Sequence, residues 1–366
     1  MPAKSITIDT LRRYAVARSL FAPTSLPAAI QRLGFVQADP IRAPARAQDL
    51  TLRHRVKNYR AGDLEQRYAE LAVEEDFFVN YGFLTRGTQA LMHPRTPSTA
   101  WTKAQSARAE AVLAFVQEHG VVHPREVDAH FAHGRVSNWF GGSSNASTQL
   151  LDDMHYRGLL RIAARSGGVR TYAVADPLPQ IAASPELAMD ALVDVIVNKY
   201  APLPERSLRE LIGRLRGGAP QWAAQRTAAF ARAKTRLPNA EVDGITWYWP
   251  LGESPSAKRY DARQSDAVRL LAPFDPVVWD RRRFELLWGW AYRFEAYTPA
   301  AKRIRGYYAL PMLWRDQVIG WGNLSVQNGK LHTTLGYVTG EAPRDKAFSA
   351  ALDDELARMA DFLRLD

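Results

Sequence analysis

Residues 107–174 constrain the fold most strongly, because their pattern of helices and strands is compatible with few topologies. Apolar residues at helical spacing predict helices at 107–119, from 122 onward and at 147–160. Alternating strand-like segments at 160–165 and 169–174, around a Ser166–Gly167–Gly168 turn, predict a β-hairpin directly after the third helix. Three helices followed by a hairpin are typical of a winged helix, whose third helix enters the DNA major groove and whose wing contacts the backbone.

A similar order of elements is predicted on both sides of this unit. After it come helices at 188–199, 204–215 and 220–234 and a hairpin over 241–249. Before it, a helix begins near Asp9 and a second helix, 26–33, ends at Gly34. Residues 35–41 are predicted to be extended and 61–93 to be further helix. The sequence therefore predicts three helix-rich units in tandem.

The C-terminal part has a different pattern. Residues 304–338 alternate apolar and polar side chains, with Arg315–Asp316 and Asn328–Gly329 as turn signals, and so predict antiparallel strands. A final helix is predicted over 345–363. This part is expected to form a small sheet or barrel that braces the helical units.

The charge of the chain is positive and uneven. The 366 residues carry 48 Lys and Arg against 38 Asp and Glu, a net charge of +10, and residues 1–60 hold 11 basic residues against three acidic ones. Such a concentration suits contact with phosphates, although a basic soluble protein without a nucleic-acid partner shows the same excess. The absence of cysteine excludes disulfides and thiol chemistry, and no apolar stretch suggests a signal peptide or a membrane span, so we expect a cytoplasmic protein.

Few residues could carry chemistry. There is no phosphate-binding glycine loop, no metal-ligand pattern and no glycine-flanked nucleophilic serine, so no metal is expected. The acidic run Glu74–Glu75–Asp76 is interpreted as a solvated helix start. Asp39 differs, because it lies in an apolar segment before Pro40, inside the most basic stretch and two residues after Gln37.

Gln37 and Asp39 are the candidate catalytic pair. In an extended strand, residues i and i+2 point to the same side, so an amide and a carboxylate would project together into a cationic surface. A carboxylate can offset the charge of an oxocarbenium-like transition state and polarise a water molecule, while the amide holds that water. Alternatively, Asp39 caps a turn before Pro40 and Gln37 bonds to the backbone.

Two blocks of sequence resemble a known family. The segment 33–41, with Gln37, Ala38 and Asp39 at its centre, is followed by Arg46 and is similar to the Gln-x-Asp signature of the YcaQ branch of the interstrand-crosslink DNA glycosylases; the AlkZ branch carries Gln-x-Gln. The second block comprises 271–275, 279–283, 292–295 and 302–311. With the helical units between them, the two blocks extend the resemblance over nearly the whole chain.

The resemblance implies a mainly α fold with α+β elements: three tandem winged-helix motifs and a C-terminal antiparallel β-barrel-like domain. We place the boundaries at 1–100, 101–180, 181–257 and 258–366. The implied activity is monofunctional excision of alkylated bases, chiefly N7-alkylpurines, and unhooking of crosslinks, in base excision repair and without metal or organic cofactor. The expected partner is alkylated double-stranded DNA, bound by a monomer associated with the nucleoid.

Further residues are candidate DNA contacts because of their charge or their place on the second winged helix. They are Arg42, Arg46, Arg53, His54, Arg55, Lys57, Asn145, Thr148, Gln149, Arg157, Arg161, Arg165, Arg170, Arg281 and Arg282. The segment 281–283 is either a phosphate clamp or a solvated strand end. The segment 305–308 is either a core strand or a platform on which bases stack; for both segments we favour the structural role.

Two other functions remain open. A winged-helix regulator without catalysis would dimerise on a palindromic site, whereas three unequal units in one chain favour a monomer. A phosphodiester nuclease would need clustered carboxylates for metal ions, and Asp39 has no acidic neighbour in the sequence.

Overall fold

The N-terminal unit packs helices against a small three-stranded sheet. The computed structural model describes residues 5–132, 134–137, 143–166, 168–178, 184–261 and 265–365. The elements of this unit are α1 (Ile8–Ser19), α2 (Leu26–Leu33), β1 (Phe35–Gln37), α3 (Ala47–Leu52), α4 (Asp63–Gln66), η1 (Tyr68–Glu70), β2 (Val73–Phe77), β3 (Tyr81–Thr85) and α5 (Arg86–Ala90). The central strand, β3, is antiparallel to both β1 and β2. Gly34 ends α2 in the left-handed conformation, as its position predicted.

The helix predicted over 61–93 is largely wrong. Its centre folds into β2 and β3, and the acidic run Glu74–Glu75–Asp76 forms the middle of β2, where these residues are 1–3% exposed. Aromatic residues near Gly82 favour strands. The acidic run can be buried because arginine and histidine side chains from other elements neutralise it, an effect that no local pattern reveals.

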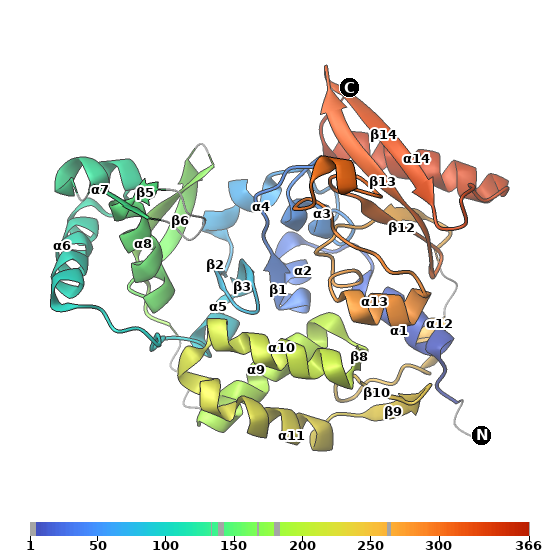
Figure 1. Ribbon diagram of the computed structural model, residues 1–366, viewed down its shortest axis with the longest axis horizontal. Coiled ribbons are helices and arrows are strands. Elements are labelled where there is room, and N and C mark those ends of the chain that lie inside the picture. The colour runs from blue at the N-terminus through green and yellow to red at the C-terminus, as the bar shows by residue number, and fades with distance from the viewer. Residues whose placement is uncertain are drawn as a thin grey trace.

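The second unit contains the three predicted helices and the predicted hairpin. Its elements are α6 (Lys103–His119), α7 (Pro124–Phe131), β4 (Arg135–Ser137), β5 (Ser143–Asn145), α8 (Ala146–Arg157), β6 (Leu160–Ser166) and β7 (Val169–Val174). His123 caps α7 and Pro124 occupies its first turn, as the sequence indicated. Figure 1 shows this unit at one end of the molecule, with the β6–β7 hairpin turned toward the N-terminal unit.

The third unit also follows the predicted order of helices and hairpin. Its elements are α9 (Pro185–Tyr200), β8 (Leu203–Pro204), α10 (Glu205–Gly218), η2 (Pro220–Gln225), α11 (Arg226–Arg236), β9 (Asn239–Val242) and β10 (Ile245–Tyr248). One hydrophobic cluster joins this unit to the first, because Leu11, Tyr14 and Phe35 share it with Leu192 and Ile196. The assignment of all three units as winged helices, and the boundaries between them, remain predictions.

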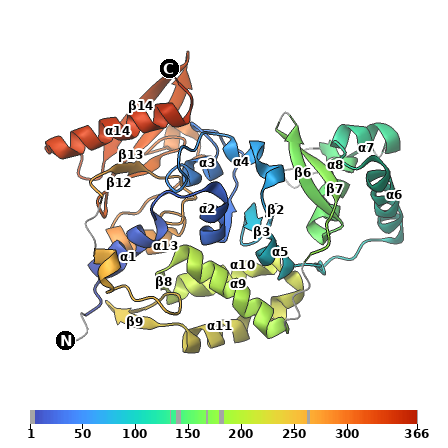
Figure 2. The ribbon, with the colours of Figure 1, turned by 180° about the vertical axis from the view of Figure 1, so that it is seen from behind.

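The C-terminal part forms an open sheet, so the predicted barrel is wrong for the described residues. Its elements are α12 (Lys258–Asp261), β11 (Val268–Leu270), α13 (Arg281–Trp288), η3 (Ala300–Lys302), β12 (Leu310–Trp314), β13 (Gln317–Gln327), β14 (Lys330–Tyr337) and α14 (Lys346–Phe362). The strands lie in the order β11-β12-β13-β14, with the short β11 and the long β14 at the edges. The helix α14 packs against the sheet through Phe348, Met359 and Phe362 (Figure 2). Apolar side chains of the sheet are therefore buried without closure into a barrel.

All strand pairs among the described residues are antiparallel, and the fold as a whole mixes helices with small sheets. Within those residues, no helix combines the length and the apolar character needed to cross a membrane.

Candidate active site and DNA-binding face

The strand β1 positions Gln37 through a close contact with β3. Phe35, Val36 and Gln37 pair with Leu84, Phe83 and Gly82. A Cβ atom at Gly82 would lie 2.3 Å from the carbonyl oxygen of Val36 and 2.9 Å from the Cα of Gln37. Any larger residue at position 82 would therefore displace the strand that carries the motif.

Gln37 is nearly buried and faces a cavity. It is 8% exposed, and its Oε1 accepts a hydrogen bond of 3.2 Å from Nδ2 of Asn80, a side chain rather than a backbone group. Gln37 and Asn80 line a cavity of about 520 Å³, which we call the Gln37 cavity. Its other lining residues come from α10, from α13 and from the segments before and after α13, and include Arg214, Phe274, Trp279, Arg281, Arg282 and Phe294.

Asp39 lies beyond the end of β1, in the coil before Pro40. The backbone N–H of Ile41 donates a 2.9 Å hydrogen bond to its Oδ1, so the turn cap expected as the alternative is present. Among the described residues, Oδ2 accepts no hydrogen bond and stays available. The backbone N–H of Asp39 donates to Oε1 of the buried Gln48 at 3.4 Å, which ties the residue to α3.

Burial of Asp39 raises the pKa of its carboxyl group above the ordinary value of 3.8, while the Ile41 hydrogen bond acts in the opposite direction. The negative charge of Asp39 also acts on the pKa of two tyrosine side chains in the C-terminal part. Burial first, and then the carboxylate of Asp39, raise the pKa of Tyr297 and of Tyr308. Asp39 therefore lies between the motif strand and the segment before β12.

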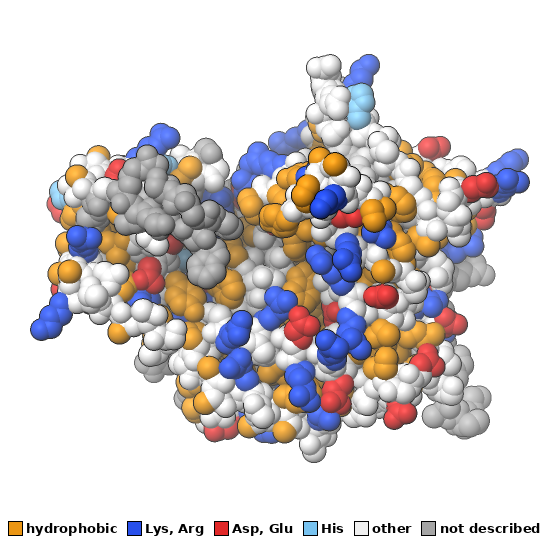
Figure 3. All heavy atoms as spheres, in the orientation of Figure 1, with side chains coloured by type: hydrophobic (Ala, Val, Ile, Leu, Met, Phe, Trp, Pro, Cys, Tyr) orange, Lys and Arg blue, Asp and Glu red, His pale blue; other side chains and the backbone are white. Residues whose placement is uncertain are grey.

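The cations of the Gln37 cavity lie on two helices. Arg281 and Arg282 form the first turn of α13 and are exposed, so the predicted strand end is wrong for this segment. Arg283 is fully buried and donates to the carbonyl oxygen of Val277 at 3.2 Å, a structural role. Arg214 of α10 lies over the ring of Trp279 at 5.2 Å. Figure 3 shows Lys and Arg side chains gathered on the face where α10 and α13 lie.

Three predicted DNA contacts near the motif are held by other groups of the chain. Arg55 is 0% exposed and pairs with Asp275 through two hydrogen bonds, of 2.7 and 2.9 Å. Arg53 is almost as buried and bonds to Glu355 at 2.8 Å. His54 lies 3.0 Å from the carbonyl oxygen of Leu270, and burial lowers its pKa well below 6.5. The side chains of Arg55 and Arg53 are too buried to contact DNA, and the partly exposed His54 is held by a backbone carbonyl, so we leave all three out of the proposed interface.

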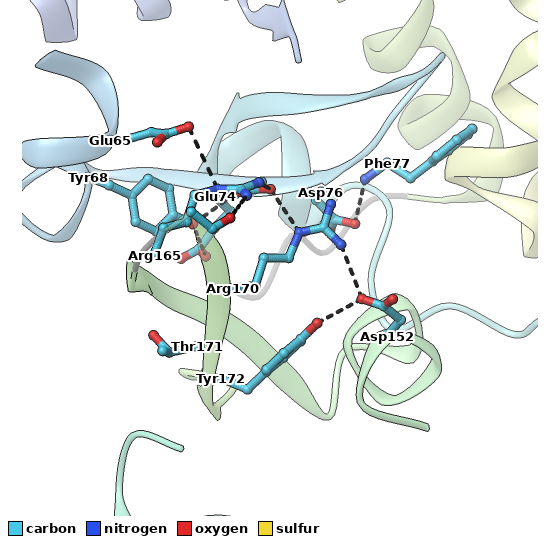
Figure 4. Close-up of polar contacts among 12 residues, drawn as sticks. Glu65, Tyr68, Glu74, Asp76, Phe77, Asp152, Arg165, Arg170, Thr171 and Tyr172 are labelled. Carbon is cyan, nitrogen blue, oxygen red and sulfur yellow. Dashed lines mark hydrogen bonds and ion pairs between the residues drawn. The ribbon is translucent and has the colours of Figure 1, made fainter. Parts of the chain in front are cut away.

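The predicted wing arginines bind carboxylates of the chain itself. Arg161 lies 3.2 Å from Glu74, Arg165 forms an ion pair with Glu75, and Arg170 lies 3.1 Å from the same Glu75. Figure 4 shows Arg165 and Arg170 reaching from the β6–β7 hairpin toward β2. Arg46 also bonds to Glu65. Arg161, Arg165 and Arg170 hold the second unit against the first, and we leave these three and Arg46 out of the proposed interface.

These contacts form one set of ion pairs, which we call the junction network. Arg86 also belongs to it, lying 3.8 Å from Glu74 and 3.5 Å from Asp176. Asp152 of α8 completes it by accepting hydrogen bonds from Arg170 and from the hydroxyl of Tyr172 (Figure 4). The full network is Glu65, Glu74, Glu75, Asp152 and Asp176 with Arg46, Arg86, Arg161, Arg165 and Arg170.

The candidate DNA contacts on and beside α8 differ in whether other groups of the chain already hold their side chains. Asn145 caps the helix, and its Oδ1 accepts from the N–H groups of Ser147 and Thr148. Arg157 lies over the ring of Trp101 at 4.1 Å and donates to the carbonyl oxygen of Thr99. Gln149 is exposed, as are Arg42 and Lys57 in the N-terminal unit. The sequence interpretation missed Asn80, Arg214 and Trp279, which no local pattern connects with Gln37.

No group of three or more potential metal ligands occurs among the residues whose placement is described.

The similarity to known proteins extends over the whole molecule. A family model described as "DNA glycosylase AlkZ-like" matches residues 30–362. The solved structure of the Streptomyces sahachiroi DNA glycosylase AlkZ is similar in fold, with a TM-score of 0.60 over 98% of this chain and 97% of that one, at 15% identity. The chain therefore belongs to the AlkZ-like family of DNA glycosylases.

Proposed function

We propose that this protein is a monofunctional DNA glycosylase that hydrolyses the N-glycosidic bond of N7-alkylpurines in duplex DNA. The observation that carries the proposal is the placement of Asp39. One of its oxygens is held by the turn and the other is free, and the residue lies two positions after Gln37, which lines a cavity that also contains arginine side chains. A carboxylate with a free oxygen can stabilise the positive charge that develops on the sugar during hydrolysis.

In the proposed reaction, the carboxylate of Asp39 stabilises the positive charge that develops on the sugar and accepts a proton from the attacking water. A bond forms between the water oxygen and C1′ while the bond between C1′ and the base nitrogen breaks, and the base leaves with that electron pair. Gln37, held by Asn80, orients the water. The products are a free base and an abasic site.

The leaving group explains why one carboxylate is sufficient. An N7-alkylguanine already carries a positive charge, and the electron pair it gains on departure neutralises that charge. General acid assistance is therefore unnecessary, whereas an unmodified purine would need a proton donor. A crosslink attached through N7 presents the same leaving group and is the second substrate to test.

The proposed DNA interface consists of exposed cations near the Gln37 cavity and the N-terminal unit. It comprises Arg42, Lys57, Arg214, Arg281 and Arg282. We propose that a monomer binds DNA of any sequence in this way, in the cytoplasm and on the nucleoid.

Release of base from defined DNA tests the proposal directly. The purified protein is incubated with a duplex that contains N7-methylguanine, and free base is separated from DNA by chromatography. Release above the rate without protein supports a glycosylase. Binding to a palindromic site without release would favour a regulator, and strand cleavage that depends on added Mg²⁺ would favour a nuclease.

Binding to undamaged duplex is expected to weaken with salt. The logarithm of the association constant should fall by about 0.9 for each phosphate neutralised, per unit of log salt concentration. Arg281→Ala should reduce this slope by about 1, because one phosphate contact is lost. Arg344→Ala is the control, since Arg344 is 92% exposed but lies in the turn before α14. An Arg281 variant with an unchanged slope would remove that residue from the interface.

The excision rate is expected to fall on the acid side at a pH above the ordinary aspartate value. The mechanism needs Asp39 ionised, and burial raises its pKa above 3.8, so the active form is lost progressively as pH decreases through the raised pKa. Single-turnover rates between pH 4 and pH 8, corrected for spontaneous depurination, measure this limb. A rate that does not decrease with acidity, in a protein that circular dichroism shows to be folded, would contradict the assignment.

A further inference from the structure

The segment between α13 and β12 exposes large apolar side chains beside the motif. Tyr297 is 80% exposed and Ile304 is 81% exposed, which makes them the two most exposed large hydrophobic residues of the described chain. Tyr307 in the same segment is 44% exposed. We call residues 295–308 the apolar loop. Apolar side chains gathered on a surface in this way indicate an interaction site.

The apolar loop is held in a fixed shape by Glu295. This residue is 6% exposed, and its Oε2 accepts hydrogen bonds from the backbone N–H groups of Ile304, at 2.9 Å, and Arg305, at 2.8 Å. Thr298 donates its N–H to the carbonyl oxygen of Glu295 and accepts from Arg303. Because these hydrogen bonds fix the base of the loop, the side chains of Tyr297 and Ile304 extend into solvent and do not pack onto the protein surface.

The loop lies next to the catalytic motif. Arg42 and Pro44, which follow Asp39, line one cavity of about 1040 Å³ together with Ile304, Tyr307 and Tyr308. Phe294, at the start of the loop, contacts the rings of Tyr297 and Tyr308, with centroids 6.0 and 5.1 Å apart. Phe294 also lines the Gln37 cavity. The loop or the residue directly before it therefore lines both cavities.

The charges around the loop fit a polyanion. Arg303 lies over the ring of Tyr307 at 5.0 Å, and Arg42, Lys302 and Arg305 are neighbours in the chain or in the cavity. The Oε2 of Glu295 is turned inward to backbone amides, and its Oε1 pairs with Arg305 at 3.8 Å, so Arg42, Lys302 and Arg303 are the cations around the loop that Glu295 leaves uncompensated. Figure 3 shows hydrophobic side chains around the position of η3 with Lys and Arg side chains beside them. A hydrophobic protein partner would not need this cationic rim.

We propose that Tyr297 and Ile304 insert into the DNA duplex as a wedge, beside the base pair whose sugar faces Asp39. This inference rests on the proposed function and adds the element that opens the helix. Aromatic and aliphatic side chains placed between base steps unstack them, and flanking cations hold the distorted backbone. The distortion would give Asp39 access to a sugar that normal stacking and pairing keep inside the helix.

The test compares excision from two duplexes. In one, N7-methylguanine is paired with cytosine; in the other, it lies opposite a stable abasic analogue, where little pairing has to be broken. Tyr297→Ala should slow excision from the paired duplex by about tenfold or more and from the unpaired one by less than about twofold. Tyr297→Trp, which keeps a stacking ring, should restore the rate. Leu251→Ala removes a side chain that is 63% exposed elsewhere and should change neither rate.

A second readout does not depend on catalysis. A duplex with 2-aminopurine next to the lesion should become more fluorescent when the wild-type protein binds, and Tyr297→Ala should remove most of that increase. Equal fluorescence and equal excision in the two proteins would overturn the wedge while leaving the glycosylase proposal intact. A Tyr297-dependent increase without any base release would support the wedge and reject the proposed chemistry. Because Tyr297 is exposed, equal melting temperatures are expected and confirm that the variants are folded.

Discussion

Asp39→Asn is expected to abolish excision of N7-methylguanine, with the single-turnover rate falling by about 10²–10⁴-fold. The substitution keeps the size of the side chain and the acceptor for the N–H of Ile41, but it removes the negative charge and the base. The loss would therefore be one of transition-state stabilisation rather than of structure. The measurement is the rate of base release with protein in excess over DNA.

The controls for this prediction separate catalysis from binding and folding. Affinity for undamaged duplex should stay within a few-fold, because the proposed phosphate contacts are unchanged. Asp194→Asn is a matched variant: burial raises the pKa of Asp194 as well, but this residue pairs with Arg236 on the third unit. It should excise at the wild-type rate. Equal rates for the Asp39 variant and the wild type would remove Asp39 from the mechanism.

Asp275→Asn is expected to lower the free energy of unfolding by about 3–5 kcal/mol. Asp275 and Arg55 are both 0% exposed, and the carboxylate is the charged partner of a guanidinium that also donates to the carbonyl oxygens of Ser19 and Thr51. The variant leaves a buried positive charge without compensation. Chemical denaturation followed by tryptophan fluorescence measures the loss.

Two further variants show whether burial is the cause of that loss. Glu341→Gln breaks the ion pair with Arg344, in which both side chains are at least 79% exposed, and should change stability by less than about 0.5 kcal/mol. The double variant Arg55→Met with Asp275→Leu removes both charges and should be more stable than either single variant. A double variant as unstable as the sum of the single ones would show that the pair contributes no coupling.

The elements that the sequence predicted well are those specified by local signals. The hairpins β6–β7 and β13–β14 have glycine at their turns, with positive φ at Gly168 and Gly329, and the final helix α14 begins directly after Asp345, close to the predicted start. Helices with regular apolar spacing, such as α9, were also predicted. In each case neighbours in the sequence determine the structure, so no knowledge of tertiary contacts is needed.

The failures have a common physical cause. Three consecutive acidic residues are normally solvated, yet Glu75 is buried in β2 because Arg165 and Arg170 come from a hairpin about 90 residues away. Arg55 has the composition of a phosphate ligand and is fully buried because Asp275 compensates it. Local patterns carry no information on such long-range compensation of charge.

The candidate site was predicted only in its central residues. Gln37 and Asp39 were identified from their place in the chain, and β1 brings Gln37 to the cavity. Arg281 and Arg282 reach the same cavity from the first turn of α13, about 240 residues later, and not from a strand end. Asn80 and Arg214 were missed, because their relation to Gln37 exists only in the folded chain.

The junction network contains five carboxylates and five guanidinium groups, whose formal charges cancel. The surplus of +10 therefore belongs entirely to residues elsewhere. An approaching phosphodiester therefore meets no net formal charge where the second unit joins the body, despite the many arginines there. The junction network therefore adds nothing to the net charge. The exposed cations at other positions supply the long-range attraction and decide how a duplex is oriented as it approaches.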